Sequence, residues 1–268
     1  MLEFVIPVRH PQNARNWSVL KRNLAQTVAS IAAQTCNSWT AVIVANHGAD
    51  LPELPERFQV CWVDFPPKQQ RCGEQLDRDW EVDSFRMDKG KRVLAGLLQA
   101  KASGHVMFVD DDDLVSNRLA EFVEGTPNAN GWYVGRGYVW LDGSSLFYEN
   151  REFSGLCGTC HIVRADLLRI PESLEAASDT YIKRMLGSHI MIEKILESDG
   201  TSLLPLPFIG AVYRVGHSEA ASRIWFPGLS WYWTPRVVYA LKYLRRIMSI
   251  RYISVALRQE FFGSRKMR

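Results

Sequence analysis

Apolar and polar residues alternate along the first half of the chain in blocks that change between strand spacing and helix spacing. Residues 4–8 and 39–46 are apolar runs rich in β-branched side chains, and residues 58–65 alternate between apolar and polar side chains. These three patterns predict strands. Residues 16–33 place leucine, valine and isoleucine at helical spacing, which predicts a helix between the first two strands.

A second helix and a fourth strand follow in the same order. Residues 88–104 have helical spacing and lead directly into the apolar run 106–109. Strands separated by helices predict an α/β fold with a mostly parallel sheet, and ligands of such sheets bind at the carboxyl ends of the strands. Because Arg9, Asn46 and the aspartates 110–113 each follow a predicted strand, we expect them to meet at one edge of the sheet.

The second half of the chain is less regular. Residues 131–143 predict strands joined by turns, and residues 153–168 predict a strand that enters a helix. Helical spacing followed by a glycine predicts a helix over residues 186–197, and residues 211–215 predict a strand. The Thr-Pro pair at 234–235 has the form of an N-cap with proline at the first helical position, and predicts a C-terminal amphipathic helix.

Composition places the chain among globular proteins. It has 268 residues, of which 47% are hydrophobic and 23% charged. Its first residues predict a strand and not a secretory leader, and no apolar run approaches the ~18 residues of a spanning helix. The five scattered cysteines favour reduced thiols and a cytoplasmic location. The pair Cys157 and Cys160 lacks the two further ligands of a structural zinc site, so we expect no zinc or redox role for it.

Positive charge is concentrated at the C-terminal end. From Arg236 onward there are nine lysines and arginines and one acid, a net charge of +8, while the rest of the chain carries −5. Ten aromatic residues lie among them between positions 225 and 262. Three interpretations remain open: a helix on the inner surface of a membrane, a helix packed on the rest of the protein, or an oligomer contact. No motif supports a nucleic-acid partner.

The four aspartates at 110–113 are the strongest chemical signal. Adjacent carboxylates repel one another, and a divalent cation among them removes the repulsion. Mg²⁺ and Mn²⁺ take hard oxygen ligands, so Asp110 and Asp112, which alternate, predict a metal site at the strand's end. The alternative is an acidic helix start, in which Asp113 would serve as a cap. The position at a strand end favours the metal.

Four segments together resemble a known family. They are "VIPV", "VIVANHG", "DKGKRVLAGLLQAKASGHVMFVDDDD" and "GSHIMIEKILESDGTSLLPLPFIGAVYRVGHSEAAS". In this order they resemble a family 2 glycosyltransferase of the GT-A fold. The resemblance implies a Rossmann-like, mixed, mostly parallel sheet flanked by helices over residues 1–223. It further implies a nucleotide-binding half (1–115) and an acceptor-side half (116–223). Beyond them, the charge and the aromatic residues indicate an aromatic, basic helical extension (224–268).

The resemblance also assigns roles to individual residues. Asp112 would bind a Mn²⁺ or Mg²⁺ ion that bridges the diphosphate of a nucleotide sugar, and His217 would complete the metal or diphosphate site. The alternative for His217 is a solvent-facing loop residue, and the alternative for Lys89 and Arg92 is a solvated helix face. At Asn46 the family usually has an aspartate, which leaves the base in question. The residues implied at the nucleotide are Pro7, Arg9, Asn46, Lys89, Arg92, Asp110 and Asp111.

The chain departs from the family where the catalytic base is expected. Ser188 and His189 stand in place of a Glu-Asp pair. An unperturbed histidine is mostly neutral at pH 7, so His189 can take a proton from an acceptor hydroxyl. Glu193, one helical turn further on, would orient it. Asp179 and Glu175 are alternative bases, and a further alternative is that His189 only begins a helix.

The resemblance implies a metal-dependent, inverting glycosyltransferase that moves a sugar from a UDP-linked donor to a saccharide or glycolipid acceptor, in the assembly of a bacterial-type surface polysaccharide. Two alternatives remain. A nucleotidyltransferase also uses aspartates at strand ends with Mg²⁺, but more often has a glycine-rich loop after its first strand. A catalytically inactive protein that binds sugar nucleotides, or serves as a scaffold, would explain the missing Glu-Asp pair.

Overall fold

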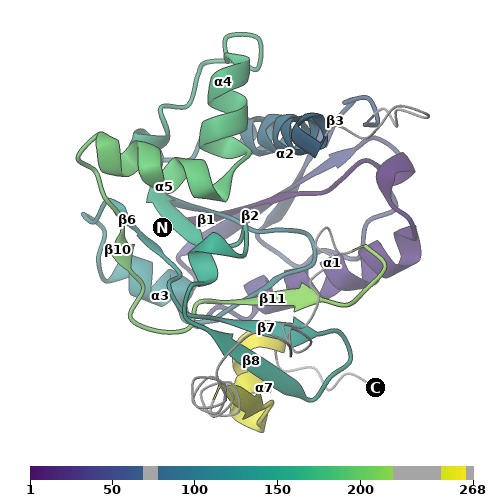
Figure 1. The fold of residues 1–268 in the computed structure, drawn as a ribbon, viewed down its shortest axis with the longest axis vertical. Coiled ribbons are helices and arrows are strands. Elements are labelled where there is room, and N and C mark those ends of the chain that lie inside the picture. Colours follow the sequence, from purple (N-terminus) through teal and green to yellow (C-terminus); the bar gives the residue numbers. More distant parts are fainter. Residues whose placement is uncertain (69–77, 220–248, 264–268) are drawn as a thin grey trace, which may run out of the picture.

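The central sheet of the computed structural model has seven strands in the order β10-β6-β9-β4-β1-β2-β3 (Figure 1). The structure describes residues 1–68, 78–219 and 249–263. Four of the six pairings are parallel, and β9 is antiparallel to both of its neighbours. The predicted mixed, mostly parallel sheet is therefore confirmed. Its strands are β1 (Leu2–Pro7), β2 (Trp39–Asn46), β3 (Phe58–Val63), β4 (His105–Phe108), β6 (Gly131–Tyr133), β9 (His161–Arg164) and β10 (Leu204–Pro205).

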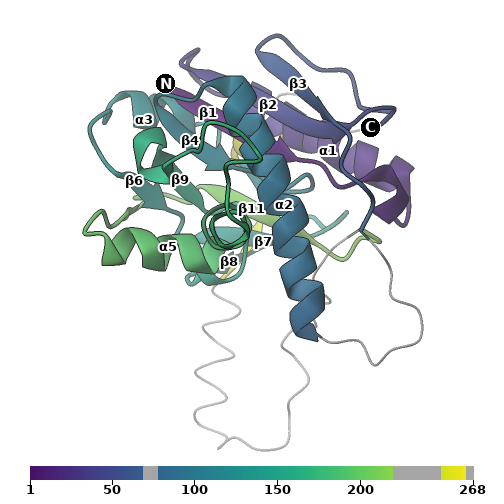
Figure 2. The ribbon, with the colours of Figure 1, turned by 90° about the horizontal axis from the view of Figure 1, so that it is seen from above.

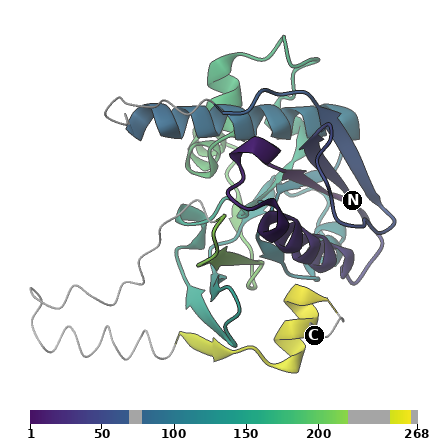
Figure 3. The ribbon, with the colours of Figure 1, turned by 90° about the vertical axis from the view of Figure 1, so that its right-hand side faces the viewer.

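Helices cover both faces of this sheet (Figures 2 and 3). Because successive side chains of a strand point to opposite faces, Phe4 and Ile6 of β1 pack in the core under α1 and α3, and Val5 packs in the core under α2 and α5. Alternation within each strand thus supplies both layers of the core. The helices are α1 (Trp17–Ala32), α2 (Arg78–Ala100), α3 (Leu119–Glu124), α4 (Asp179–Tyr181) and α5 (His189–Ser198).

The helices predicted at 16–33, 88–104 and 186–197 are present with shifted ends. The helix expected at 88–104 begins ten residues earlier, at Arg78, and ends at Ala100. A π-helical turn, Ile182–Leu186, separates α4 from α5, which begins at His189. The helix expected at the end of residues 153–168 is a single 3₁₀ turn after β9. The 3₁₀ turns are Pro11–Asn13, Phe153–Gly155 and Ala165–Leu168.

A second sheet, which the sequence analysis did not predict, lies beside the first in the order β12-β8-β7-β11-β5. Only β7 and β11 pair in parallel. The last described segment belongs to this sheet, since β12 pairs with β8 and helix α7 (Val255–Phe262) follows it. Phe262 lies 5.0 Å from Trp140, measured between ring centroids. The strands are β5 (Leu114–Val115), β7 (Gly137–Leu141), β8 (Leu146–Asn150), β11 (Ala211–Val215) and β12 (Ile250–Tyr252).

The predicted amphipathic helix after Thr234 falls within residues 220–248, which lie outside the described part of the chain. Its proposed contact with a membrane surface therefore stays a prediction. Within the described ranges, no helix combines the length and the apolar character needed to cross a bilayer.

Candidate functional site

The four aspartates connect the two sheets. They follow β4 of the central sheet and precede β5 of the second sheet, so the chain crosses from one to the other through residues 110–113. Asp110, Asp111 and Asp112 line a cavity of about 180 Å³. The remaining lining residues are Pro7, Arg9, Phe85, Asp88, Lys89, Arg92, Leu156, Gly158, Gly187, His189, Tyr213 and Arg214. The expected convergence of strand-end residues on one edge is thus observed for the aspartates and Arg9.

Asp113 points away from the cavity and is fully buried. Its carboxylate accepts hydrogen bonds from Thr159 Oγ1 at 2.6 Å and from Cys157 Sγ at 3.1 Å. Burial raises its pKa well above the ordinary value, and the neighbouring Asp112 adds to the shift. The cap proposed for Asp113 is wrong, because α3 begins only at Leu119. Asp113 instead joins the end of β4 to the loop before β9.

Cys157 and Cys160 are free thiols in this loop. Both are buried, and burial raises the pKa of each thiol well above its ordinary value. A protonated thiol is a hydrogen-bond donor, which fits the contact of Cys157 with the Asp113 carboxylate. Cys157 is thus a donor to that buried carboxylate.

Lys89 on α2 reaches the first aspartate. Its Nζ forms an ion pair with Asp110 Oδ1 on the wall of the cavity. Burial lowers the pKa of Lys89, but the charge of Asp110 and their hydrogen bond outweigh burial and hold it above the ordinary value. The Lys89 side chain is 14% exposed, so the alternative of a solvated helix residue is wrong.

Arg92, one turn further along α2, is 1% exposed and lines the same cavity. Its Nη1 donates to Asn46 Oδ1 at 2.8 Å, and its Nε donates to both carboxylate oxygens of Asp88. Asn46 Nδ2 donates in turn to the carbonyl of Phe65 at 2.7 Å. Asn46 does not line the cavity. Its Oδ1 holds Arg92, and its predicted contact with a nucleotide stays a prediction.

Arg9 follows β1 and contacts the second aspartate. Its Nη2 lies 3.4 Å from Asp111 Oδ1, and its Nη1 donates to the Glu219 carbonyl at 2.8 Å. Burial raises the pKa of Asp111 to about 6, against the opposing charge of Arg9. Asp111 Oδ2 is buried and has no hydrogen-bond partner among the described residues.

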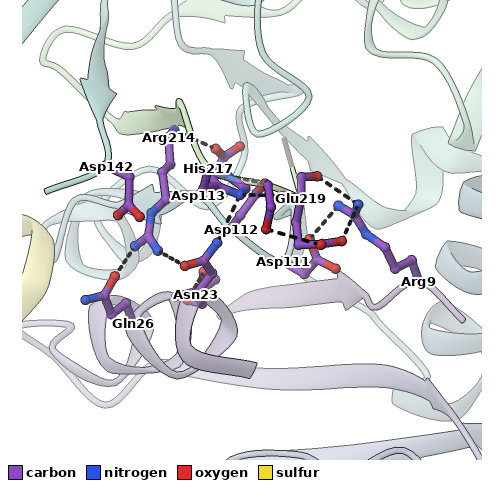
Figure 4. A network of polar contacts seen from close by, with 12 residues as sticks. Arg9, Asn23, Gln26, Asp111, Asp112, Asp113, Asp142, Arg214, His217 and Glu219 are labelled. Carbon is purple, nitrogen blue, oxygen red and sulfur yellow. Dashed lines mark hydrogen bonds and ion pairs between the residues drawn. The ribbon is translucent and has the colours of Figure 1, made fainter. Parts of the chain in front are cut away.

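His217 lies behind Asp112 (Figure 4). Its Nε2 is 3.1 Å from Asp112 Oδ2, and its side chain is 2% exposed, so the solvent-facing alternative is wrong. Its Nδ1 is 3.2 Å from both Asn23 Nδ2 and the backbone nitrogen of Glu219. The sequence thus identified a residue that lies against Asp112, although His217 does not line the cavity.

Sequence reasoning missed Glu219, which holds the loop that carries His217. Its carboxylate is 2% exposed and accepts from the backbone N–H groups of Arg15 at 3.1 Å and Asn16 at 2.6 Å. Asn16 is the N-cap of α1, so Glu219 joins the end of β11 to the start of that helix. A single acid in a polar loop gives no local signal of such a contact.

Arg214 was also missed. It is fully buried, with its guanidinium 4.8 Å from the centre of the Trp140 ring and hydrogen bonds to Asn23 and Gln26 (Figure 4). Burial lowers its pKa to about 10. Arg214 still lines the cavity, so it adds a fourth cation to Arg9, Lys89 and Arg92.

His189 is the first residue of α5 and lies in the wall between two cavities. The second cavity has a volume of about 370 Å³ and shares Phe85, Gly187 and His189 with the first. Burial, with a smaller contribution from the charge of Lys89, lowers the pKa of His189 to about 4. The ring is therefore neutral at pH 7, and its Nε2 is buried without a hydrogen-bond partner among the described residues.

The other residues expected to act as the catalytic base, or to orient it, form no hydrogen bond with His189 Nε2 within the described ranges. Glu193 Oε2 is 3.3 Å from His161 Nε2 on β9, so the expectation that Glu193 orients His189 is wrong. One helical turn separates the two side chains in sequence, but the neighbouring strand offers Glu193 a closer partner. Asp179 and Glu175 are exposed and line neither cavity.

The site fits a metal ion only in part. Within the described ranges, no group of three or more His, Cys, Asp or Glu side chains is arranged to hold a metal alone. Mg²⁺ is usually held by one or two carboxylates together with substrate phosphate oxygens. Asp112, which lines the cavity with 12% of its side chain exposed, fits such a substrate-completed site.

Comparison with known proteins gives little further information. No protein-family model matches the chain, and no curated protein does. S. aureus TarS, a glycosyltransferase of the GT-A type, is similar in structure: its residues 1–349 match with 14% identity over 80% of this chain and a TM-score of 0.42. A second TarS structure matches with 15% identity over 80% of this chain and a TM-score of 0.38. The chain spans 60% and 36% of those two chains. Scores this low support no argument about fold or activity.

Proposed function

We propose that the chain is a metal-dependent, inverting glycosyltransferase of GT-A family 2 that takes its sugar from a UDP-linked donor. One observation carries the proposal. Three carboxylates that follow a parallel strand and four cations, Arg9, Lys89, Arg92 and Arg214, line the same cavity. Carboxylates alone would suit a cation and cations alone an anion. Both together suit a diphosphate that arrives with a divalent metal.

The donor would be held by the wall of the first cavity. Asp112 would hold Mn²⁺ or Mg²⁺ together with the diphosphate oxygens, and the metal would stabilise the negative charge on the departing nucleoside diphosphate. Asp110, which is 30% exposed and held by Lys89, can accept a hydrogen bond from a ribose hydroxyl. Pro7 and Arg9 at the end of β1, together with Asp111 after β4, would supply the edge for the base. Arg92, held by Asn46, completes that edge.

The acceptor would enter through the second cavity. Three exposed apolar side chains, Val82, Phe85 and Ile190, line it, beside Lys68 and Arg86. This mixture suits a saccharide or glycolipid with an apolar face. His189 stands between the two cavities and is neutral at pH 7, so it can take the proton of the attacking hydroxyl.

One observation favours a second candidate function. A base whose pKa is about 4 is weak, and Glu193 does not support it. A catalytically inactive protein that binds a sugar nucleotide is therefore the alternative. Turnover separates the two: an enzyme releases UDP from a UDP-sugar, and a binding protein does not.

The first test is calorimetric titration of UDP and GDP into the full chain, with and without Mn²⁺. We expect UDP to bind only with metal, and Asp112→Asn to abolish that binding. The matched control is Asp142→Asn, because Asp142 pairs with Arg22 and does not line the cavity. If UDP binds equally well without metal or to Asp112→Asn, or if neither nucleotide binds, the proposal is wrong.

A further inference from the structure

The orientation of the Asn23 side chain is set by its neighbours. Asn23 Oδ1 accepts a hydrogen bond from Arg214 Nη1 at 2.7 Å and another from Arg22 Nη2 at 3.3 Å. Arginine has only donors, so the oxygen of the amide must face both guanidinium groups. The amide nitrogen of Asn23 consequently faces His217 Nδ1, at 3.2 Å.

A second donor faces the same ring nitrogen. The backbone N–H of Glu219 donates to His217 Nδ1 at 3.2 Å, and a backbone N–H cannot exchange its role. Two donors directed at Nδ1 require that this nitrogen presents its lone pair. The hydrogen of the imidazole ring therefore lies on Nε2.

This arrangement is the reverse of that in a metal-bound histidine. A histidine that binds a metal through Nε2 needs the lone pair there, and normally donates its other N–H to a carboxylate or carbonyl. Around His217 Nδ1 the groups are donors, Asn23 and Glu219, instead of acceptors. The ring thus does not fit the role of metal ligand that the sequence suggested.

The position of the His217 ring agrees with a hydrogen on Nε2, the nitrogen that lies beside Asp112. His217 does not line the cavity, its side chain is 2% exposed, and Nε2 is 3.1 Å from Asp112 Oδ2. Nε2 has no hydrogen-bond partner within the described ranges, although Asp112 Oδ2 lies so close to it. A buried donor without a partner costs about 1–3 kcal/mol. A small rotation of the Asp112 carboxylate would remove that cost.

We propose that His217 is a positioning residue that donates from Nε2 to Asp112, is held in this tautomer by Asn23 and Glu219, and does not ligate the metal. The inference rests on the proposed function in one respect only, namely that Asp112 is the carboxylate that binds the metal. Carboxylates that bind metals are themselves commonly hydrogen-bonded from behind, and such partners orient them.

The tautomer is measured directly by two-bond ¹H–¹⁵N correlation spectra of the full chain labelled with ¹⁵N. The spectrum of His217→Gln identifies the ring signals of residue 217. We expect a protonated Nε2 and a lone pair on Nδ1, both unchanged when Mg²⁺ and UDP are added together. A proton on Nδ1, or an Nε2 that loses its proton when metal is added, overturns the inference. This readout does not depend on activity.

Binding by variants supplies the second test. Glutamine keeps an N–H donor near the position of Nε2 but is a poor metal ligand, whereas alanine has no donor. We expect His217→Gln to change the metal-dependent affinity for UDP less than ~3-fold and His217→Ala to weaken it ~10-fold or more. Equal losses in both variants overturn the inference. If UDP does not bind to the unaltered chain, the proposed function fails, while the tautomer still decides the inference.

Discussion

Lys89 on α2 and Asp110 after β4 form an ion pair on the wall of the main cavity, and the backbone of Gly158 lies against both side chains. A Cβ atom at position 158 would lie 2.5 Å from Asp110 Oδ2 and 2.6 Å from Lys89 Nζ. The loop packs this closely against the ion pair because position 158 carries no Cβ atom.

Gly158→Ala should therefore displace the ion pair. Both atoms that a new methyl group would meet are ends of flexible side chains, so we expect the free energy of unfolding to fall by only about 1 kcal/mol. Metal-dependent UDP affinity should fall ~10-fold, because Asp110 would no longer be held. Gly155→Ala is the matched control, since nothing lies within 4 Å of its added Cβ. Calorimetry that gives equal UDP affinities for the two variants would contradict the assigned role of the pair.

The buried ring of His189 should make stability depend on pH. Its pKa in the folded chain is about 4, below the ~6.5 of an unperturbed histidine. The unfolded chain therefore binds a proton between these values that the folded chain does not. The stabilisation is complete above pH 6.5 and is lost as the pH falls toward 4.

This pH dependence is measured by urea unfolding of the original chain and of His189→Gln, each at pH 7 and at pH 5. We expect the original chain to lose about 1–2 kcal/mol more than the variant between the two pH values. His47→Gln, at an exposed histidine, is the control. If His189 is the base, the acidic limb of kcat/KM should also lie near pH 4 and not near 6.5. Parallel stability losses in all three proteins would contradict the assignment.

Glu219→Ala should destabilise the chain by about 1–3 kcal/mol, because the backbone N–H groups of Arg15 and Asn16 would lose their acceptor. Glu219→Gln keeps one carbonyl oxygen for these donors, so we expect a smaller loss. Urea unfolding at one pH compares the two. Unchanged stability in Glu219→Ala would show that this carboxylate does not hold the loop of His217.

The last described helix should contribute to the stability of the whole chain. Phe262 is 5% exposed and packs against Trp140 and Phe147, so Phe262→Ala should cost about 3–5 kcal/mol. Val255 begins the same helix and is 74% exposed, and Val255→Ala should change stability by less than about 0.5 kcal/mol. A small effect of Phe262→Ala would mean that α7 does not form part of the core.

Much of the central sheet could be predicted without the structure. The strands β1 and β2 of this sheet and the helix α1 lie within a residue or two of their predicted ends, and so does β11 of the second sheet. The position of the aspartates at the end of β4 was predicted in the same way. These features depend on the spacing of side chains along a few adjacent turns or strand residues, which is a local property of the chain.

The pairing of strands into the second sheet could not be predicted in this way, although β11 was. Its strands are short, between two and five residues, and they pair across large separations in sequence, as β12 does with β8. A short apolar run near the C-terminus is equally compatible with a helix or a strand. Only pairing with an existing strand decides between them.

By itself, the sequence determined which chemical groups are available: four aspartates, two basic residues on the preceding helix, and a histidine in a distant loop. It also determined that the aspartates follow a strand and therefore lie at one edge of the sheet. Tertiary structure decided what each of them contacts. It directs Asp113 to Thr159 and away from the cavity, pairs Glu193 with His161, and places Asn46 behind Arg92. Hydrogen bonds between residues far apart in sequence depend on how whole elements pack, so local spacing cannot specify them.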